Sequence, residues 1–305
     1  MVLLSLILIQ LLVVAAHVLS TVCSKYRSMK ASSPRLKHLL FFGCYVIVAC
    51  NLLLVILKSF NFEKRVHGIL CHVIWGWLFG IGFVVSLGTL SVRTWRLYRI
   101  FVHSWKPGSF LSDSKLITCV LLLVLINVLN SIVWTAIPEV RYNAEIVKAE
   151  TVEAGMRAVT LATICSCQDV CYIMFGIEMG YLGLILLSTT TLSLLTHNIR
   201  RKDFSTISLR VLVYLLVVVL FAGFPAHFLL IIYKLQVWSV VEICLTLNMV
   251  TFLFLIFDFA PPLIPLMREK FCFHNLSSNS LTSLKVGLAT ATNCGSSQTA
   301  KSFVY

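Results

Sequence analysis

Apolar residues fall into seven long blocks along the chain, and polar or charged residues separate the blocks. The blocks lie at 2–22, 38–58, 70–92, 116–137, 172–195, 209–233 and 236–257. Each has about 20 residues, the length that a helix needs to cross a hydrocarbon core roughly 30 Å thick. Backbone groups in lipid have to be satisfied within a helix. The pattern therefore predicts an all-α membrane protein, a seven-transmembrane-helix bundle.

Composition and charge agree with this prediction. The chain of 305 residues is 59% hydrophobic and 12% charged, whereas soluble domains carry about 25% charged residues. A net charge of +13 would suit a nucleic-acid-binding protein. The lysines and arginines, however, lie between the apolar blocks or at their ends. This placement fits membrane topology, so we expect contacts with membrane lipid and no nucleic-acid partner.

Basic residues gather in every second connection. The connections 24–38, 91–115 and 196–210, with the segment after 267, hold 18 of the 25 lysines and arginines. Because cytosolic loops carry such an excess, the N-terminus is predicted to be extracellular and the C-terminus cytosolic. Residues 1–270 then form the membrane domain, and 271–305 form a short disordered cytosolic tail rich in Ser, Thr and Asn. No basic segment precedes the first block, which favours a spanning helix over a cleaved signal peptide.

Four cysteines lie near the predicted outer face. Cys71 opens the third block, and Cys165, Cys167 and Cys171 close the long connection 137–171. The outside compartment is oxidising, so we expect a disulfide bond from Cys71 to Cys165 or Cys167 that fixes this connection to the bundle. A zinc site in CSCQDVC is the alternative, but no histidine lies in the connection to complete it. We therefore predict no metal ion.

A few polar side chains interrupt the apolar blocks. Ionisable groups inside a membrane are functional candidates, and Glu178, His227 and Glu242, with Trp238, outline a possible pocket in the bundle. Four amides are expected to bond between helices, namely Asn51, Asn127, Asn130 and Asn248. No catalytic motif such as HExxH or GxSxG is present in the sequence. We predict neither an enzyme nor a cofactor.

Residues 71–101, CHVIWGWLFGIGFVVSLGTLSVRTWRLYRIF, carry the most specific pattern. Cys71 stands at the outer end, Gly82 and Phe83 follow as a pair, and Arg93 precedes Trp95 by two residues. This order resembles the third helix of class C G-protein-coupled receptors of the metabotropic GABA type B group. Similar stretches of that group are KASSPRLKHLLFFG at 30–43, GYLGLILL at 180–187, FPA at 224–226 and FAPPLIPLM at 259–267. Leu182 and Pro262 stand where the family has lysine.

The resemblance implies a receptor that signals across the plasma membrane to a heterotrimeric G protein and forms a dimer with another class C receptor subunit. The family's extracellular Venus-flytrap ligand domain has no counterpart before the first block, so we expect a fragment of a longer receptor, a partner subunit or an orphan. The alternatives are a non-signalling dimer partner or escort, and a seven-helix transporter or channel subunit.

The resemblance also implies roles at the cytosolic face. In the family, the basic residue that matches Arg93 pairs with an acid at the inner end of the sixth helix, and Asp203 is the acid near that position. Arg99 lies four residues after Trp95 and is expected to stack on its ring. The predicted G-protein-coupling surface and cytosolic lock comprise Arg93, Trp95, Arg96, Arg99, Arg200, Arg201, Lys202 and Asp203.

Overall fold

Every predicted apolar block forms a helix. The computed structural model describes residues 2–22, 34–59, 64–102, 112–136, 143–153, 156–166, 169–196, 204–233 and 238–257. The helices are α1 (Val2–Val22), α3 (Pro34–Ser59), α4 (Lys64–Val73), η2 (Ile74–Phe79), α5 (Gly80–Val102), α6 (Asp113–Ala136), α7 (Asp169–Leu195), α8 (Phe204–Ile232) and a last helix at 238–257.

Six helices in the described ranges are long and apolar enough to cross a membrane. They cover Arg35–Leu57, Gly68–Arg99, Asp113–Ala136, Ile173–Leu195, Ile207–His227 and Trp238–Phe257, and α1 adds a shorter apolar stretch at Ile7–Leu19. The prediction of a seven-helix bundle is confirmed for the membrane part of the chain.

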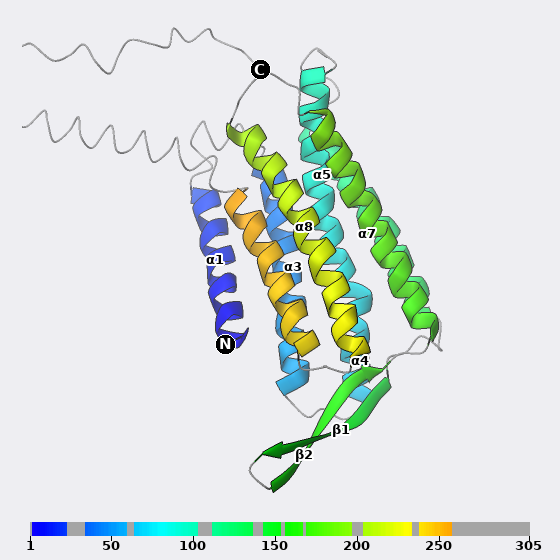
Figure 1. Ribbon diagram of the computed structural model, residues 1–305. Coiled ribbons are helices and arrows are strands. Elements are labelled where there is room, and N and C mark those ends of the chain that lie inside the picture. The colour runs from blue at the N-terminus through cyan, green and yellow to red at the C-terminus, as the bar shows by residue number, and fades with distance from the viewer. Residues whose placement is uncertain are drawn as a thin grey trace, which may run out of the picture.

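The membrane helices alternate in direction, so the bundle has two ends (Figure 1). One end holds the start of α1 and a two-stranded hairpin at 143–166, and we call it the hairpin end. At the other end α5 carries Arg93, Arg96 and Arg99, and we call it the arginine end. The N-terminal helix thus begins on the side of the hairpin. That this side is extracellular stays a prediction.

The hairpin is a feature that the apolar pattern did not predict. β1 (Asn143–Glu153) pairs antiparallel with β2 (Met156–Ser166), in a register that joins Asn143 to Ser166 and Glu153 to Met156. Both strands lie against α4. The sequence predicted only a long connection here, and the fold instead adds two strands to an otherwise helical molecule.

The third membrane helix is longer than predicted and contains a π-helical turn. α4, η2 and α5 follow one another without a break from Lys64 to Val102, whereas the apolar block covers 70–92. A π turn changes the backbone bonding from i→i+4 to i→i+5. Beside it, the Cys50 thiol of α3 donates to the Ile74 carbonyl oxygen at 3.8 Å. The turn lies where the helix leaves the hairpin end and enters the centre of the bundle.

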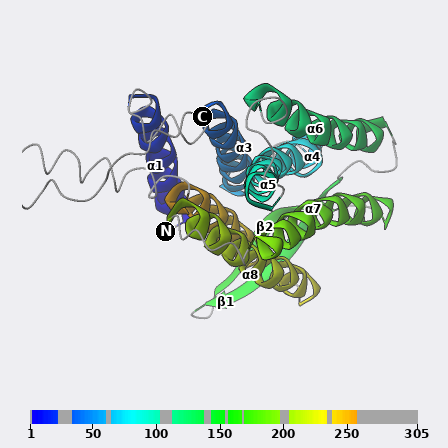
Figure 2. The same ribbon diagram turned by 90° about the horizontal axis from the view of Figure 1, so that it is seen from above.

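The central helix is α5, which packs against α3, α6 and α7 (Figure 2). Glycines let α3 and α5 approach closely. A Cβ on Gly43 would lie 3.0 Å from the Ser86 backbone nitrogen and 3.2 Å from the Gly82 carbonyl oxygen. Small residues at such contacts are a common basis of helix association in lipid. The α3–α5 contact therefore depends on the absence of a side chain at Gly43.

Residues 258–305 lie outside the described part of the chain. The predicted tail at 271–305 and the similarity of 259–267 to the family's seventh-helix ending both fall there, and both stay predictions.

Gly43→Ala should destabilise the protein by about 1–3 kcal/mol, because backbone atoms of α5 would have to move to admit the methyl group. The matched control is Gly183→Ala, since a Cβ on Gly183 meets nothing within 4 Å. That variant should be neutral or more stable by up to about 1 kcal/mol. Unfolding free energies of both variants in bicelles test this, and equal stabilities would show that the α3–α5 contact tolerates a side chain.

Candidate functional site

The arginine end of α5 is held to the start of α6. Arg96 Nη1 lies 3.1 Å from Asp113 Oδ1, and the two side chains are 31% and 25% exposed. Asp113 begins α6, and the preceding Ser112 accepts backbone bonds from Lys115 and Leu116. A pair this exposed contributes about 0–1 kcal/mol. Its effect is positional, because it joins the two ends of the connection between α5 and α6.

Trp95 and Arg99 form a second contact at this end. The Arg99 guanidinium carbon lies 5.5 Å from the centroid of the Trp95 ring, as the four-residue spacing predicted. Trp95 in turn packs on a small apolar cluster formed by Leu36, Val92, Leu116 and Val120. The cluster draws residues from α3, α5 and α6. The arginine end of the central helix is therefore a packed surface with basic residues on it.

The structure describes only part of the predicted cytosolic lock. Arg93 is half-buried at the arginine end, beside the buried Thr94. Arg200, Arg201, Lys202 and Asp203 lie outside the described residues, so the Arg93–Asp203 pair stays a prediction. Close to that segment, Ser208 Oγ donates to the Phe257 carbonyl oxygen at 3.2 Å, which joins the start of α8 to the end of the last helix.

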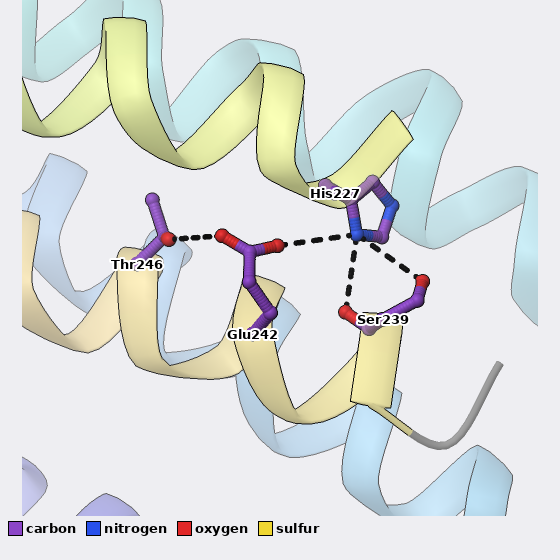
Figure 3. Close-up of polar contacts among 4 residues, drawn as sticks. All are labelled: His227, Ser239, Glu242 and Thr246. Carbon is purple, nitrogen blue, oxygen red and sulfur yellow. Dashed lines mark hydrogen bonds and ion pairs between the residues drawn. The ribbon is translucent and has the colours of Figure 1, made fainter. Parts of the chain in front are cut away.

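His227 and Glu242, two of the predicted pocket residues, meet near the hairpin end (Figure 3). His227 Nδ1 lies 3.4 Å from Glu242 Oε2, 3.0 Å from the Ser239 carbonyl oxygen and 3.3 Å from Ser239 Oγ. Thr246 Oγ1 donates to Glu242 Oε1 at 2.8 Å. These contacts join α8 to the last helix. They form just beyond Pro225, where α8 lacks a backbone donor.

Glu178 lies in a separate polar network between α6 and α7. Its carboxylate is buried, and Asn130 Nδ2 donates to Oε2 at 2.7 Å. The Asn127 amide fits its neighbours when its nitrogen faces Glu178, donating to Oε2 at 3.0 Å, while its oxygen accepts from the Ile81 backbone at 3.2 Å. Gly80 makes room for this network, because a Cβ there would clash with the carboxylate. Three helices thus meet at Glu178.

Aromatic rings lie between the two networks. The Trp75 ring centroid is 5.9 Å from that of Phe175 on α7 and 6.1 Å from that of His227 on α8. The ring centroids of Phe79 and Phe224 are 6.0 Å apart. Trp238 does not join them, since it is 64% exposed on the outside of the last helix. Of the four predicted pocket residues, three make polar contacts between or within helices, and these contacts belong to two networks rather than one.

The predicted role of the asparagines is borne out in the described helices. Asn51 Nδ2 on α3 donates to Asn248 Oδ1 at 2.8 Å and to the Cys244 carbonyl oxygen at 3.1 Å, which joins α3 to the last helix. Asn127 and Asn130 join α6 to Glu178 on α7.

Several polar partners were not anticipated from the sequence. Tyr181 on α7 donates to the Leu123 carbonyl oxygen of α6 at 2.8 Å. At the hairpin end Thr135 accepts from Trp77 at 3.1 Å and lies 2.9 Å from His72 Nε2. One signal was available: Ser239, Glu242 and Thr246 are spaced i, i+3 and i+7, which places them on one helix face. A backbone carbonyl acceptor such as that of Leu123 cannot be recognised from the sequence, because every residue has one.

The cysteines separate into two groups. Cys44, Cys50, Cys119 and Cys244 lie in membrane helices and are not disulfide-bonded. Cys71 is disulfide-bonded. The side chains of Cys165 and Cys171 and all of Cys167 lie outside the described part, so the pairing of Cys71 with Cys165 or Cys167 stays a prediction.

Comparison with known proteins gives one family and a set of relatives. Residues 1–261 match the family described as 7 transmembrane sweet-taste receptor of 3 GCPR. The chain is 28% identical over 172 residues to gamma-aminobutyric acid type B receptor subunit 2 of Rattus norvegicus, covering 56% of this chain and 18% of the relative. It is 24% identical over 186 residues to metabotropic glutamate receptor-like protein O of Dictyostelium discoideum, covering 61% of this chain and 21% of the relative. The chain thus spans about a fifth of the length of these relatives.

A double-mutant cycle with Asn130→Ala and Glu178→Ala should give a coupling free energy of about 1–2 kcal/mol, because the bond has a carboxylate acceptor and lies in the membrane. Unfolding in bicelles provides the four free energies. The control cycle joins Asn130→Ala with Thr246→Val, which acts on the other network and should couple by less than about 0.5 kcal/mol. Equal coupling in the two cycles would contradict the separation of the networks.

Proposed function

This chain belongs to the class C family of seven-transmembrane G-protein-coupled receptors, and from that premise we propose that it is the membrane-spanning signalling domain of a receptor of the metabotropic GABA type B-like group. The chain is a multi-pass protein of the plasma membrane, and its family is a receptor family. The names of its relatives and the pattern at 71–101 support the narrower group. The proposed partners are a heterotrimeric G protein and a second class C receptor subunit.

The observation that carries the proposal is the arginine end of α5. The central helix of the bundle carries three arginines there, of which Arg96 holds the start of α6 and Arg99 stacks on Trp95. Side chains held by such contacts lose little freedom when a partner binds, so they form a prepared cationic surface. Under the predicted topology this surface faces the cytosol, where a G protein is available.

Signalling also needs an element with two arrangements. Toward the arginine end of the α5–α7 contact, threonine hydroxyl groups bond to the backbone of their own helices. Thr89 donates to the Val85 carbonyl oxygen at 2.7 Å, and Thr189 donates to the Ile185 carbonyl oxygen at 2.7 Å. Such bonds stay intact when one helix moves against the other. The Glu178 network, by contrast, joins α6 to α7 directly. We therefore propose that the arginine ends of α5 and α7 shift while their hairpin halves stay in place.

The direct test reconstitutes the full chain in nanodiscs, alone and with a ligand-binding class C subunit, and measures the initial rate of nucleotide exchange on a heterotrimeric G protein. Faster exchange in either case supports the proposal. If exchange never rises but the chain increases surface expression of the other subunit, the escort function is favoured. Solute or ion flux in vesicles without exchange would favour a transporter or channel subunit.

Loss of the Arg96–Asp113 pair should lower the stimulated exchange rate. Arg96→Asp places two carboxylates side by side and releases the start of α6, so a several-fold slower exchange is expected at normal surface expression. The control is the exchanged pair Arg96→Asp with Asp113→Arg, which restores the attraction and should restore the rate. A double variant as slow as the single one would mean that Arg96 acts by direct contact instead.

Asp203→Arg should raise basal exchange if Arg93 and Asp203 hold the inactive arrangement. Loss of a contact worth about 1 kcal/mol, the upper end for an ion pair in contact with solvent, changes the ratio of the two arrangements by about fivefold. Adding Arg93→Asp should return basal exchange toward the original rate. Unchanged basal exchange in a well-expressed Asp203→Arg variant would contradict the proposed Arg93–Asp203 contact.

A further inference from the structure

Two histidines from different helices meet where α1 packs on α3. His17 lies near the end of α1, and His38 lies about one turn into α3. Their ring nitrogens, His17 Nε2 and His38 Nδ1, are 3.2 Å apart. On α3, His38, Phe41 and Tyr45 are spaced i, i+3 and i+7, so they share the face that meets α1. Both histidines lie at the arginine end, away from the networks of Glu178 and Glu242.

The imidazole of His17 is held in place from two sides. Its ring stacks on Phe41 with centroids 4.9 Å apart and planes 16° apart. Its Nδ1 lies 3.1 Å from the Tyr45 hydroxyl oxygen. A neutral imidazole has one N–H and one lone pair. When Nδ1–H donates to Tyr45, Nε2 therefore presents its lone pair toward His38.

We propose that His17 and His38 form a site for a divalent transition-metal ion of the zinc type. A histidine that binds a metal commonly donates its other N–H to a fixed acceptor, and Tyr45 supplies that acceptor. Two nitrogens at about 2.0–2.1 Å from one zinc ion at a tetrahedral angle stand about 3.3 Å apart. The observed 3.2 Å fits this geometry. Imidazole ligands favour zinc, copper or nickel over magnesium or calcium.

The metal would take the place of the direct contact between the two rings. His38 then carries its proton on Nε2 and gives the Nδ1 lone pair to the metal, while water fills the remaining coordination positions. His38 is exposed and His17 half-buried. Both lie within about a turn and a half of the arginine ends of α3 and α1, where an ion can approach from the aqueous phase on the predicted cytosolic side. No group of three or more His, Cys, Asp or Glu side chains suited to a metal occurs in the described ranges, so this is a two-ligand site. Its effect would be to fasten α1 to α3.

The test titrates zinc chloride into the purified full chain in nanodiscs and measures the thermal unfolding midpoint, with zinc X-ray absorption to identify the ligands. A saturable rise in the midpoint and a spectrum of imidazole nitrogens at about 2.0–2.1 Å are expected. His17→Ala and His38→Ala should weaken binding at least tenfold, and Tyr45→Phe, which keeps both ligands, about tenfold.

His72→Ala is the matched control, because His72 contacts Thr135 rather than another histidine, and it should bind zinc as the original chain does. His38→Gln replaces His38→Ala if the alanine variant fails to fold. The proposal is overturned by the absence of saturable binding, by unchanged affinity in the two histidine variants, or by a spectrum dominated by sulfur from cysteine ligands. None of these outcomes depends on G-protein coupling.

Discussion

Hydrogen bonds that join one membrane helix to another are the contacts on which the arrangement of this bundle depends. In lipid the apolar faces of helices gain little by meeting one another, since the surrounding chains are as apolar as the side chains. Close packing at small residues and polar bonds between helices have to supply the specificity. Asn51 joins α3 to the last helix, His227 joins that helix to α8, and Glu178 joins α7 to α6. Together these contacts fix how most of the helices are arranged.

The two halves of the bundle differ in how they are joined. At Gly223 a Cβ would lie 2.7 Å from Thr246 Cγ2, so α8 and the last helix are packed closely beside the His227–Glu242 contact. Toward the arginine end, the contact between the same two helices includes a bond from Ser208 to a carbonyl oxygen near a helix end. Bonds at helix ends are easily exchanged for water, whereas the Glu242 carboxylate contacts both His227 and Thr246 within the bundle. A movement confined to the arginine half is therefore the least costly one.

The sequence predicted what depends on local composition and missed what depends on three-dimensional contact. Apolar length was enough to place the seven helices, and the spacing of Trp95 and Arg99 was enough to predict their stacking. The π turn at 74–79 and the hairpin at 143–166 have no comparable periodic signal. The sequence grouped Glu178 with His227 and Glu242 because all three are polar groups in apolar blocks. Their division into two networks is set by which helices are neighbours, and the aromatic residues between them gave no sign of it.

The attachment of α1 is physically separate from the contacts assigned to signalling. His17 and Tyr45 join α1 to α3 on the face of α3 that carries His38 and Phe41, whereas Gly43 on the same helix meets α5. α3 therefore contacts two different helices through two different sets of side chains. A change at the histidine pair would alter how tightly α1 is held without removing a contact of α5. The attachment of α1 and the α3–α5 contact at Gly43 therefore depend on different side chains of α3.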